Sequence, residues 1–162
     1  MEIQNPKLVI AITTKDRRQL LERTLKSILS QTYQHYRVVI VNDGSSDGTR
    51  EYLESLNDGR ITVVNHEVNR GYQAARNSGM AQVREGEWVV LFDDDDVFLP
   101  DAFEKIAKTI ASISPDTSII EFGTRFRTGS EEFIGGYQFK EGETQHKMNY
   151  RQTVSGNNHR AD

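Results

Sequence analysis

Four consecutive aspartates, Asp93 to Asp96, directly follow an apolar stretch of strand length in the segment WVVLFDDDDVFLP. Carboxylates this close together repel one another, and some would hold protons near neutral pH unless a cation lay among them. Side chains two residues apart in a strand point to the same side, so Asp93 and Asp95 are expected to face one way. Oxygen ligands suit Mg²⁺ or Mn²⁺, which usually bridge to the phosphates of a substrate. A solvated acidic turn ahead of the next helix is the plain alternative.

The elements that must position these aspartates alternate along the chain. Apolar, β-branched runs predict buried strands, and amphipathic stretches between them predict helices. The predicted strands cover residues 7–13, 36–42, 60–66, 87–93 and 118–126, and the predicted helices cover 16–31, 48–56, 72–83 and 100–113. Asp16 with Gln19 is expected to cap the first helix, and Ser46 or Asp47 the second. Pro100 is expected at the first position of the fourth helix.

This alternation predicts an α/β fold with a mostly parallel sheet flanked by helices. In such sheets ligands bind beyond the carboxyl ends of the strands. Four strand ends carry polar loops, TTKDR, NDGSSDG, NHEVNRG and DDDD, which should converge on one face. That face is the expected site.

Each candidate residue in these loops has a structural and a functional interpretation. Asp43 could belong to a simple turn or accept hydrogen bonds from a base or ribose. Asp16 has a structural explanation as a helix cap, whereas Thr14 has less need of one. Arg76 could be a surface charge or could pair with a diphosphate, since arginine matches phosphate geometry.

The order of these motifs is more specific than any one of them. Residues 7–105, from VIAITTKDR through VVIVNDGSSDGT and VNRGYQAARNSG to VVLFDDDDVFLPDAF, closely resemble the family 2 glycosyltransferases of GT-A fold, a Rossmann-like architecture. The resemblance implies that Thr14, Asp16 and Asp43 hold the base and ribose of a nucleotide-sugar. It implies that Asp93 contacts the ribose and metal, that Asp95 is the direct ligand of Mn²⁺ or Mg²⁺, and that Arg76 lies near the donor phosphates. Lys15 and Asn42 depart from the family pattern.

The resemblance further implies transfer of a sugar, with inversion, from a UDP-sugar to a hydroxyl of a glycan, a lipid-linked molecule or a small molecule. We identify no general base; the carboxylates after the fifth predicted strand, Glu131, Glu132, Glu143 and Asp162, form no recognisable pattern. We therefore expect residues 1–126 to form the donor-binding core and 127–162 to begin an acceptor-side region that is incomplete here, so that transfer by this chain alone is slow or absent.

Composition and charge also bear on the possible partners and the cellular location of the protein. The 162 residues include no cysteine and carry a formal net charge of −4, which argues against disulfides and against a nucleic-acid partner. No apolar run could span a bilayer and no signal peptide is evident. The sequence predicts a cytoplasmic protein whose full-length form could contact the inner face of a membrane. Apolar surface near residues 119–139 would favour self-association.

Three other classes of protein have sequence requirements that can be compared with this chain. A nucleotidyltransferase should have a glycine-rich basic loop after the first strand, and ITTKDRRQ contains no glycine. A phospho-acceptor receiver domain should have acids at that strand end, where Thr13, Thr14 and Lys15 stand instead. A metal-dependent nucleotide-sugar-binding module without catalysis stays open beside the enzyme.

Overall fold

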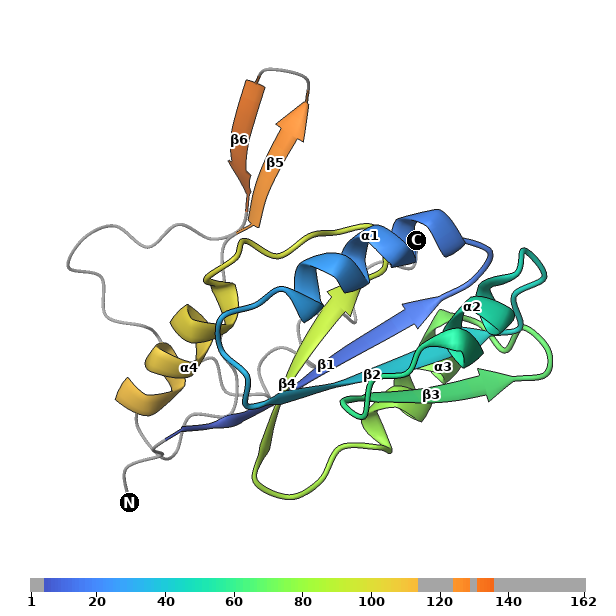
Figure 1. Ribbon diagram of the computed structural model, residues 1–162, viewed down its shortest axis with the longest axis horizontal. Helices are drawn as coiled ribbons and strands as arrows, with labels where there is room; N and C mark the ends of the chain where they lie inside the picture. The colour runs from blue at the N-terminus through green and yellow to red at the C-terminus, as the bar shows by residue number, and fades with distance from the viewer. Residues whose placement is uncertain (1–4, 114–123, 129–130, 136–162) are drawn as a thin grey trace, which may run out of the picture. The chain divides into compact units, whose positions relative to one another are not determined.

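The computed structural model describes residues 5–113, 124–128 and 131–135, in two compact units that comprise residues 1–113 and 114–162. The first unit is a four-stranded parallel sheet with strand order β3-β2-β1-β4 and helices between the strands (Figure 1). Its elements are β1 (Lys7–Thr14), α1 (Arg18–Leu29), β2 (Tyr36–Asp43), α2 (Thr49–Ser55), β3 (Ile61–His66), α3 (Tyr72–Met80), β4 (Glu87–Asp93) and α4 (Ala102–Ser112).

The predicted α/β class and parallel sheet are confirmed, with element ends displaced by a few residues. Pro100 is not the first helical residue as predicted, because α4 begins at Ala102 with Asp101 as its N-cap. Within the described residues, no helix is long and apolar enough to cross a membrane. The domain boundary between residues 126 and 127 stays a prediction.

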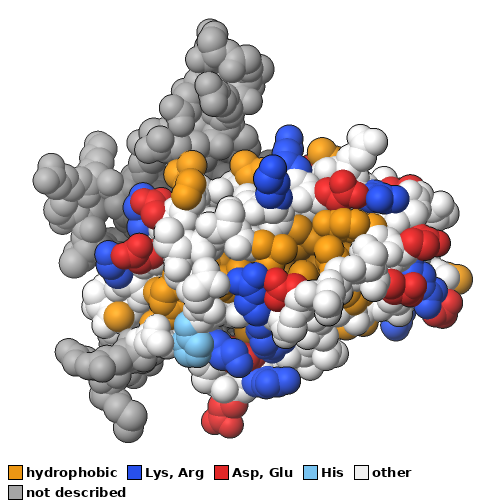
Figure 2. Space-filling model, viewed as in Figure 1, with side chains coloured by type: hydrophobic (Ala, Val, Ile, Leu, Met, Phe, Trp, Pro, Cys, Tyr) orange, Lys and Arg blue, Asp and Glu red, His pale blue; other side chains and the backbone are white. Residues whose placement is uncertain are grey.

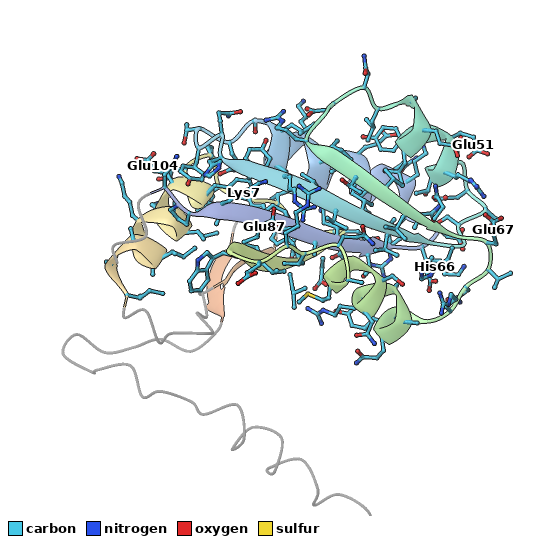
Figure 3. All side chains as sticks on the ribbon, turned by 90° about the horizontal axis from the view of Figure 1, so that it is seen from below. Lys7, Glu51, His66, Glu67, Glu87 and Glu104 are labelled. Carbon is cyan, nitrogen blue, oxygen red and sulfur yellow. The ribbon has the colours of Figure 1, made fainter. Side chains whose placement is uncertain are left out.

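Helices cover both faces of the sheet. Figures 1 and 3 show α1 and α2 on one face and α3 on the other, as right-handed crossovers require for this strand order. Figure 2 shows acidic and basic side chains interspersed over one face of the molecule, around an area of hydrophobic side chains. Strand β2 lies in the centre, and its residues Val38, Val39, Ile40 and Val41 are fully buried.

Strand β4 differs from the prediction of a buried strand. Only β1 pairs with it among the described residues, and Leu91 is 44% exposed. The apolar run predicted a buried strand, whereas the face of β4 on the α3 side is partly exposed. This opening matters for the site, because Asp93 ends the same strand.

The second unit contains an antiparallel hairpin of β5 (Thr124–Thr128) and β6 (Glu131–Gly135). The strand predicted over 118–126 falls mainly on residues outside the description, and its last three residues belong to β5. The surface expected to favour self-association, residues 119–139, also lies largely outside the described residues.

A buried ion cluster fastens the amino end of the sheet. Arg37 donates from Nε to Oε1 of Glu87 (2.9 Å) and from Nη2 to Oε2 (2.6 Å), so it joins β2 to β4 across β1. Lys7 Nζ lies 3.2 Å from Oε1 of the same carboxylate, and Figure 3 shows these two side chains together. The hydrogen bonds from Arg37 lower the pKa of Glu87 from 4.5 to about 2, despite the opposing effect of burial.

We predict that Glu87→Gln lowers the free energy of unfolding by about 3 kcal/mol at pH 7, because Arg37 loses its buried partner. Since the folded pKa lies below the unfolded one, this stabilisation is complete above about pH 4.5 and disappears as the pH falls toward 2. Urea denaturation of both proteins from pH 7 to pH 2 measures it, with the exposed Glu85→Gln as control. A difference that does not shrink on acidification would contradict the assignment.

Candidate functional site

The acidic run at the end of β4 is divided by burial. Asp94 is 5% exposed and points to the α1 side, where its carboxylate accepts hydrogen bonds from Thr14 Oγ1 (2.7 Å) and Arg17 Nη1 (3.1 Å). Asp93 and Asp95 are exposed. One of the four aspartates therefore holds the loop to β1 and α1, and its two neighbours remain available to a ligand.

The backbone of the run is held by helix α1. The Thr24 hydroxyl lies 2.9 Å from the carbonyl oxygen of Asp94 and 2.6 Å from that of Asp96. Arg23 donates to the carbonyl oxygen of Asp95 (2.5 Å). These bonds fix the direction in which the exposed carboxylates project, and such preorganisation favours a binding site over a loose acidic turn.

The charge of the run is only partly balanced. Arg17 lies between Asp94 and Asp95, with Nη1 at 3.1 Å from a carboxylate oxygen of each. Burial, followed by repulsion from Asp95 and Asp93, raises the pKa of Asp96. Repulsion from the neighbouring Asp95 and Asp93 is one cause of this shift, and a positive charge placed near these carboxylates would oppose it.

A divalent cation fits these residues only with help from a ligand. The described part of the chain contains no group of three or more acidic, histidine or cysteine side chains close enough to enclose a metal ion. Mg²⁺ is often held by one or two carboxylates, with water and substrate phosphates completing the shell. Asp93 and Asp95 can supply that pair, so the donor set suits a cation that arrives with a phosphate-bearing ligand.

The loops after β1 and β2 are tied together by carboxylates. Asp16 adopts φ 52° and accepts hydrogen bonds from the backbone N–H (2.7 Å) and the hydroxyl (3.2 Å) of Ser46. Hydrogen bonds from Lys15 and then from Ser46 lower the pKa of Asp16. The predicted capping pair of Asp16 and Gln19 is wrong, because α1 begins at Arg18 and the N–H of Arg18 donates to Asp47 instead (3.0 Å).

The expected cap of α2 is right in part. Asp47 is not the N-cap residue, which is Gly48, but its Oδ1 accepts the N–H of Thr49, the first residue of the helix (3.1 Å). One carboxylate thus satisfies the first N–H of two helices. Ser46 donates hydrogen bonds to Asp16 instead and does not cap α2.

Asp43, at the end of β2, is buried beneath the loop that leads into α3. It accepts hydrogen bonds from Nδ1 of His66 (2.7 Å) and from the N–H groups of Arg70 and Gly71 (2.9 Å each). Nε2 of His66 lies 2.9 Å from the hydroxyl of Ser78 on α3. Burial alone would raise the pKa of Asp43, but the hydrogen bonds from His66, Arg70 and Gly71 outweigh this effect, so the pKa is lowered.

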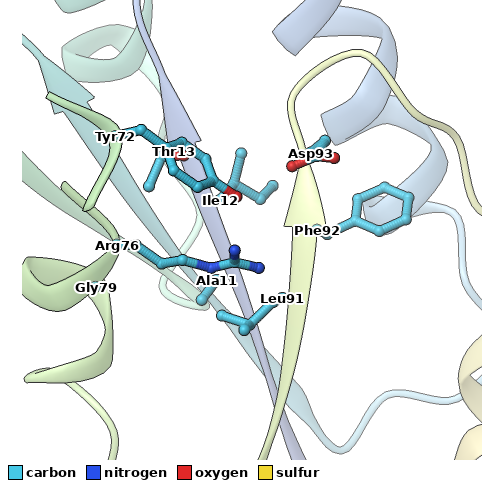
Figure 4. Close-up of a pocket in the computed structure, with 9 residues that line it drawn as sticks. All are labelled: Ala11, Ile12, Thr13, Tyr72, Arg76, Gly79, Leu91, Phe92 and Asp93. Atoms are coloured by element: carbon cyan, nitrogen blue, oxygen red, sulfur yellow. The ribbon is translucent and has the colours of Figure 1, made fainter. Parts of the chain in front are cut away.

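A small pocket opens between α3 and the carboxyl ends of β1 and β4 (Figure 4). Arg76 extends across it from α3, with its guanidinium 5.2 Å from the centre of the Tyr72 ring. Figure 4 shows Tyr72 beside Thr13 and shows Asp93 across the pocket on β4. The pocket is lined by Ala11, Ile12, Thr13, Tyr72, Arg76, Gly79, Leu91, Phe92 and Asp93. It combines a cationic fork, an aromatic ring and a carboxylate, a set suited to a phosphorylated ligand with a planar group.

The structure brings some predicted site residues together and separates others. Arg76 and Asp93 line one pocket, and Asp95 follows Asp93 in the same exposed run. Thr14 is 3% exposed on the α1 side, bonded to Asp94. Sequence reasoning missed the anchoring role of Asp94, whose partners Thr14 and Arg17 lie 80 and 77 positions away in sequence. It also missed Tyr72, whose one signal is an aromatic ring directly after Gly71.

Asn42, which departs from the family pattern, is buried on the side away from this pocket. Its amide donates to Oδ1 of Asn65 on β3 (2.9 Å), and its own Oδ1 accepts the N–H of Ser45 (3.1 Å). This side chain therefore shapes the loop after β2.

Comparison with known proteins gives a consistent result. A family model described as glycosyl transferase family 2 matches residues 9–158. The chain is 35% identical over 134 residues to the uncharacterized glycosyltransferase YwdF of Bacillus subtilis (strain 168), an alignment that covers 78% of this chain and 49% of that protein.

Two solved structures share the fold. S. aureus TarS in complex with UDP matches with a TM-score of 0.59 and 28% identity, over 64% of this chain and 32% of that one. The mannosyltransferase PcManGT from Pyrobaculum calidifontis, in complex with GDP-Man and Mn²⁺, matches with a TM-score of 0.58 and 27% identity, over 70% of this chain and 34% of that one. The chain thus spans about half of the curated relative and a third of each solved chain.

We predict that Asp94→Ala lowers the free energy of unfolding by about 2 kcal/mol, because the buried hydroxyl of Thr14 loses its charged acceptor. Asp93→Ala is the matched control and should change it by less than about 0.5 kcal/mol, since Asp93 is exposed. Chemical denaturation at pH 7 measures both. Equal losses in the two variants would show that the four aspartates are not divided into anchor and ligand.

Proposed function

The chain belongs to glycosyl transferase family 2, and from that membership we propose that it binds a nucleotide-diphosphate sugar with a divalent cation and takes part in transfer of the sugar to an acceptor hydroxyl. The observation that carries the proposal is the pocket that both Arg76 and Asp93 line, with the exposed carboxylate of Asp95 two residues further along the chain. The chain has the parallel sheet of the GT-A fold, and its structural neighbours share that fold.

In the proposed complex the donor diphosphate lies at the end of β4. Arg76 matches phosphate geometry, while Asp93 and Asp95 hold Mn²⁺ or Mg²⁺, with Asp95 as the direct ligand. A cation there stabilises the negative charge of the departing diphosphate. The complex of PcManGT with GDP-Man and Mn²⁺ supports the involvement of a metal, and those of TarS with UDP and UDP-GlcNAc support our choice of a UDP-sugar.

Asp16 and Asp43 are proposed to form the base and ribose side of the donor site. Oδ2 of Asp43 accepts one hydrogen bond within the described residues, so it retains capacity for a donor group on the nucleotide. Thr14 joins this set indirectly, because its hydroxyl already donates to Asp94. Its role is to hold Asp94 inward.

Transfer is proposed to invert the anomeric carbon, with the acceptor hydroxyl attacking opposite the leaving diphosphate and losing its proton to a general base. The acceptor is a glycan, a lipid-linked molecule or a small molecule. We assign no general base among the described residues. Because the chain spans half or less of its relatives, transfer is a property proposed for the whole protein.

Calorimetric titration of UDP and GDP, each with and without Mn²⁺, tests the donor site. We predict that UDP binds more tightly than GDP and that omission of Mn²⁺ weakens binding by at least about tenfold, or 1.4 kcal/mol. Asp95→Asn should weaken UDP binding to a similar degree in Mn²⁺ and have little effect without it, because it removes a charged ligand at constant size.

The control for charge alone is Asp101→Asn, at the N-cap of α4, where the carboxylate pairs with Lys105. This variant should bind UDP as the unaltered protein does. Metal-dependent binding without measurable transfer would favour the binding module over the enzyme. Binding of neither nucleotide in Mn²⁺ would contradict the proposed function.

A further inference from the structure

Tyr72 is a large aromatic side chain left exposed at the edge of the pocket. It is the first residue of α3 and is 51% exposed, although strand residues beside it in the pocket are buried. Among the described residues, its hydroxyl has no hydrogen-bond partner. Neither burial nor the hydroxyl explains the position of the ring.

The backbone that carries this ring is held firmly. Asp43 accepts the N–H groups of Arg70 and Gly71, the two residues directly before Tyr72. Gly71 has φ 86°, and its carbonyl accepts the N–H of Ala75 to begin the helix. A buried carboxylate of β2 thus fixes the point at which Tyr72 leaves the backbone.

The loop before Tyr72 is also held by close packing. Gly44, after β2, has φ 69°, and a Cβ atom there would lie 2.6 Å from the backbone nitrogen of Asn69. A side chain at position 44 would therefore displace the loop. The two loops approach each other this closely only because Gly44 is a glycine.

The ring itself is held by Arg76, one turn along α3. The guanidinium lies 5.2 Å from the ring centre, within the range of a cation–π contact. Arg76 also lines the pocket with Asp93. The same arginine therefore orients the ring and faces the region in which we place the donor phosphates, while the exposed part of the ring remains accessible.

We propose that the Tyr72 ring is the surface on which the nucleobase of the donor stacks. This inference rests on the proposed function, which places the diphosphate at β4. In the strand order β3-β2-β1-β4, a donor with its diphosphate at β4 extends its nucleoside over β1 toward β2. Tyr72 lies on that side of the pocket, beside Thr13, with Asp93 across from it (Figure 4).

Stacking requires only a planar partner, so the proposal makes a prediction about every nucleobase. In Mn²⁺, Tyr72→Ala should raise the Kd for both UDP and GDP by about tenfold to a hundredfold. Tyr72→Phe keeps the ring and should stay within about threefold of the unaltered protein for both. Pyrophosphate, titrated in Mg²⁺, contains no base and should bind equally to all three proteins.

Tyr52 provides a matched control. It also lies on a helix beneath an arginine, with the Arg18 guanidinium 5.6 Å from its ring centre, but it does not line the pocket. Tyr52→Ala should therefore leave nucleotide affinity unchanged. Thermal unfolding confirms that each variant is folded, and Tyr72→Leu, which keeps apolar bulk without an aromatic ring, replaces Tyr72→Ala if the latter unfolds.

The outcomes separate this inference from the function on which it rests. If UDP binds and Tyr72→Ala and Tyr72→Leu leave its affinity unchanged, stacking is overturned and the proposed function stands. If these variants weaken pyrophosphate as much as UDP, Tyr72 acts on the phosphate side or on the fold, and stacking is again overturned. If the unaltered protein binds neither UDP nor GDP, both proposals fail together.

Discussion

The separation of four adjacent carboxylates is the constraint on which the rest of the site depends. Burying Asp94 against Thr14 and Arg17 removes one charge from the exposed run and leaves Asp93 and Asp95 exposed. A buried carboxylate is tolerated only when it is paired and hydrogen-bonded, and β1 and α1 supply both partners. The protein itself therefore relieves part of the repulsion, and the remaining negative charge lies on the exposed side chains of Asp93, Asp95 and Asp96.

The same principle recurs at the other strand ends, where carboxylates serve as acceptors for backbone N–H groups of distant loops. Asp47 reaches the start of α1, Asp16 reaches the loop after β2, and Asp43 reaches the loop before α3. Hydrogen bonds to an ionised acceptor are stronger than neutral ones, so these contacts hold the loops in fixed relative positions. Asp16 and Asp43, which we propose as nucleotide contacts, thus also hold the loops that shape the nucleotide site. Substitution of either residue would therefore alter the neighbouring loops.

The strands and helices could be predicted because their signals are local: apolar runs of strand length and amphipathic periods. The prediction that Asp93 and Asp95 face one way assumed strand alternation, whereas β4 ends at Asp93 and Asp95 lies in the turn that follows. The cap of α1 was missed because its acceptor, Asp47, lies 29 positions away in sequence, whereas the local spacing of Asp16 and Gln19 imitates a capping box. The exposure of Leu91 was missed because an apolar run reads the same on a central strand and on an edge strand. Tyr72 was missed because a single aromatic residue at the start of a helix forms no periodic pattern. Its exposure at the edge of the pocket is visible only in the structure.

The two carboxylates that we propose as metal ligands, Asp93 and Asp95, are too few to enclose a cation, so the proposed site would depend on the donor to complete the coordination shell. If the diphosphate completes the coordination shell, cation and donor each strengthen the binding of the other by the same factor, because such coupling is reciprocal. Arg17, which contacts both Asp94 and Asp95, would weaken binding of the metal alone, because a cation at Asp95 competes with this arginine for the carboxylate. A site built this way holds metal weakly alone and firmly with the donor. Asp93 and Asp95 alone would hold the metal only weakly once the diphosphate had left, so the incomplete ligand set is compatible with turnover, which a closed cage of protein ligands would hinder.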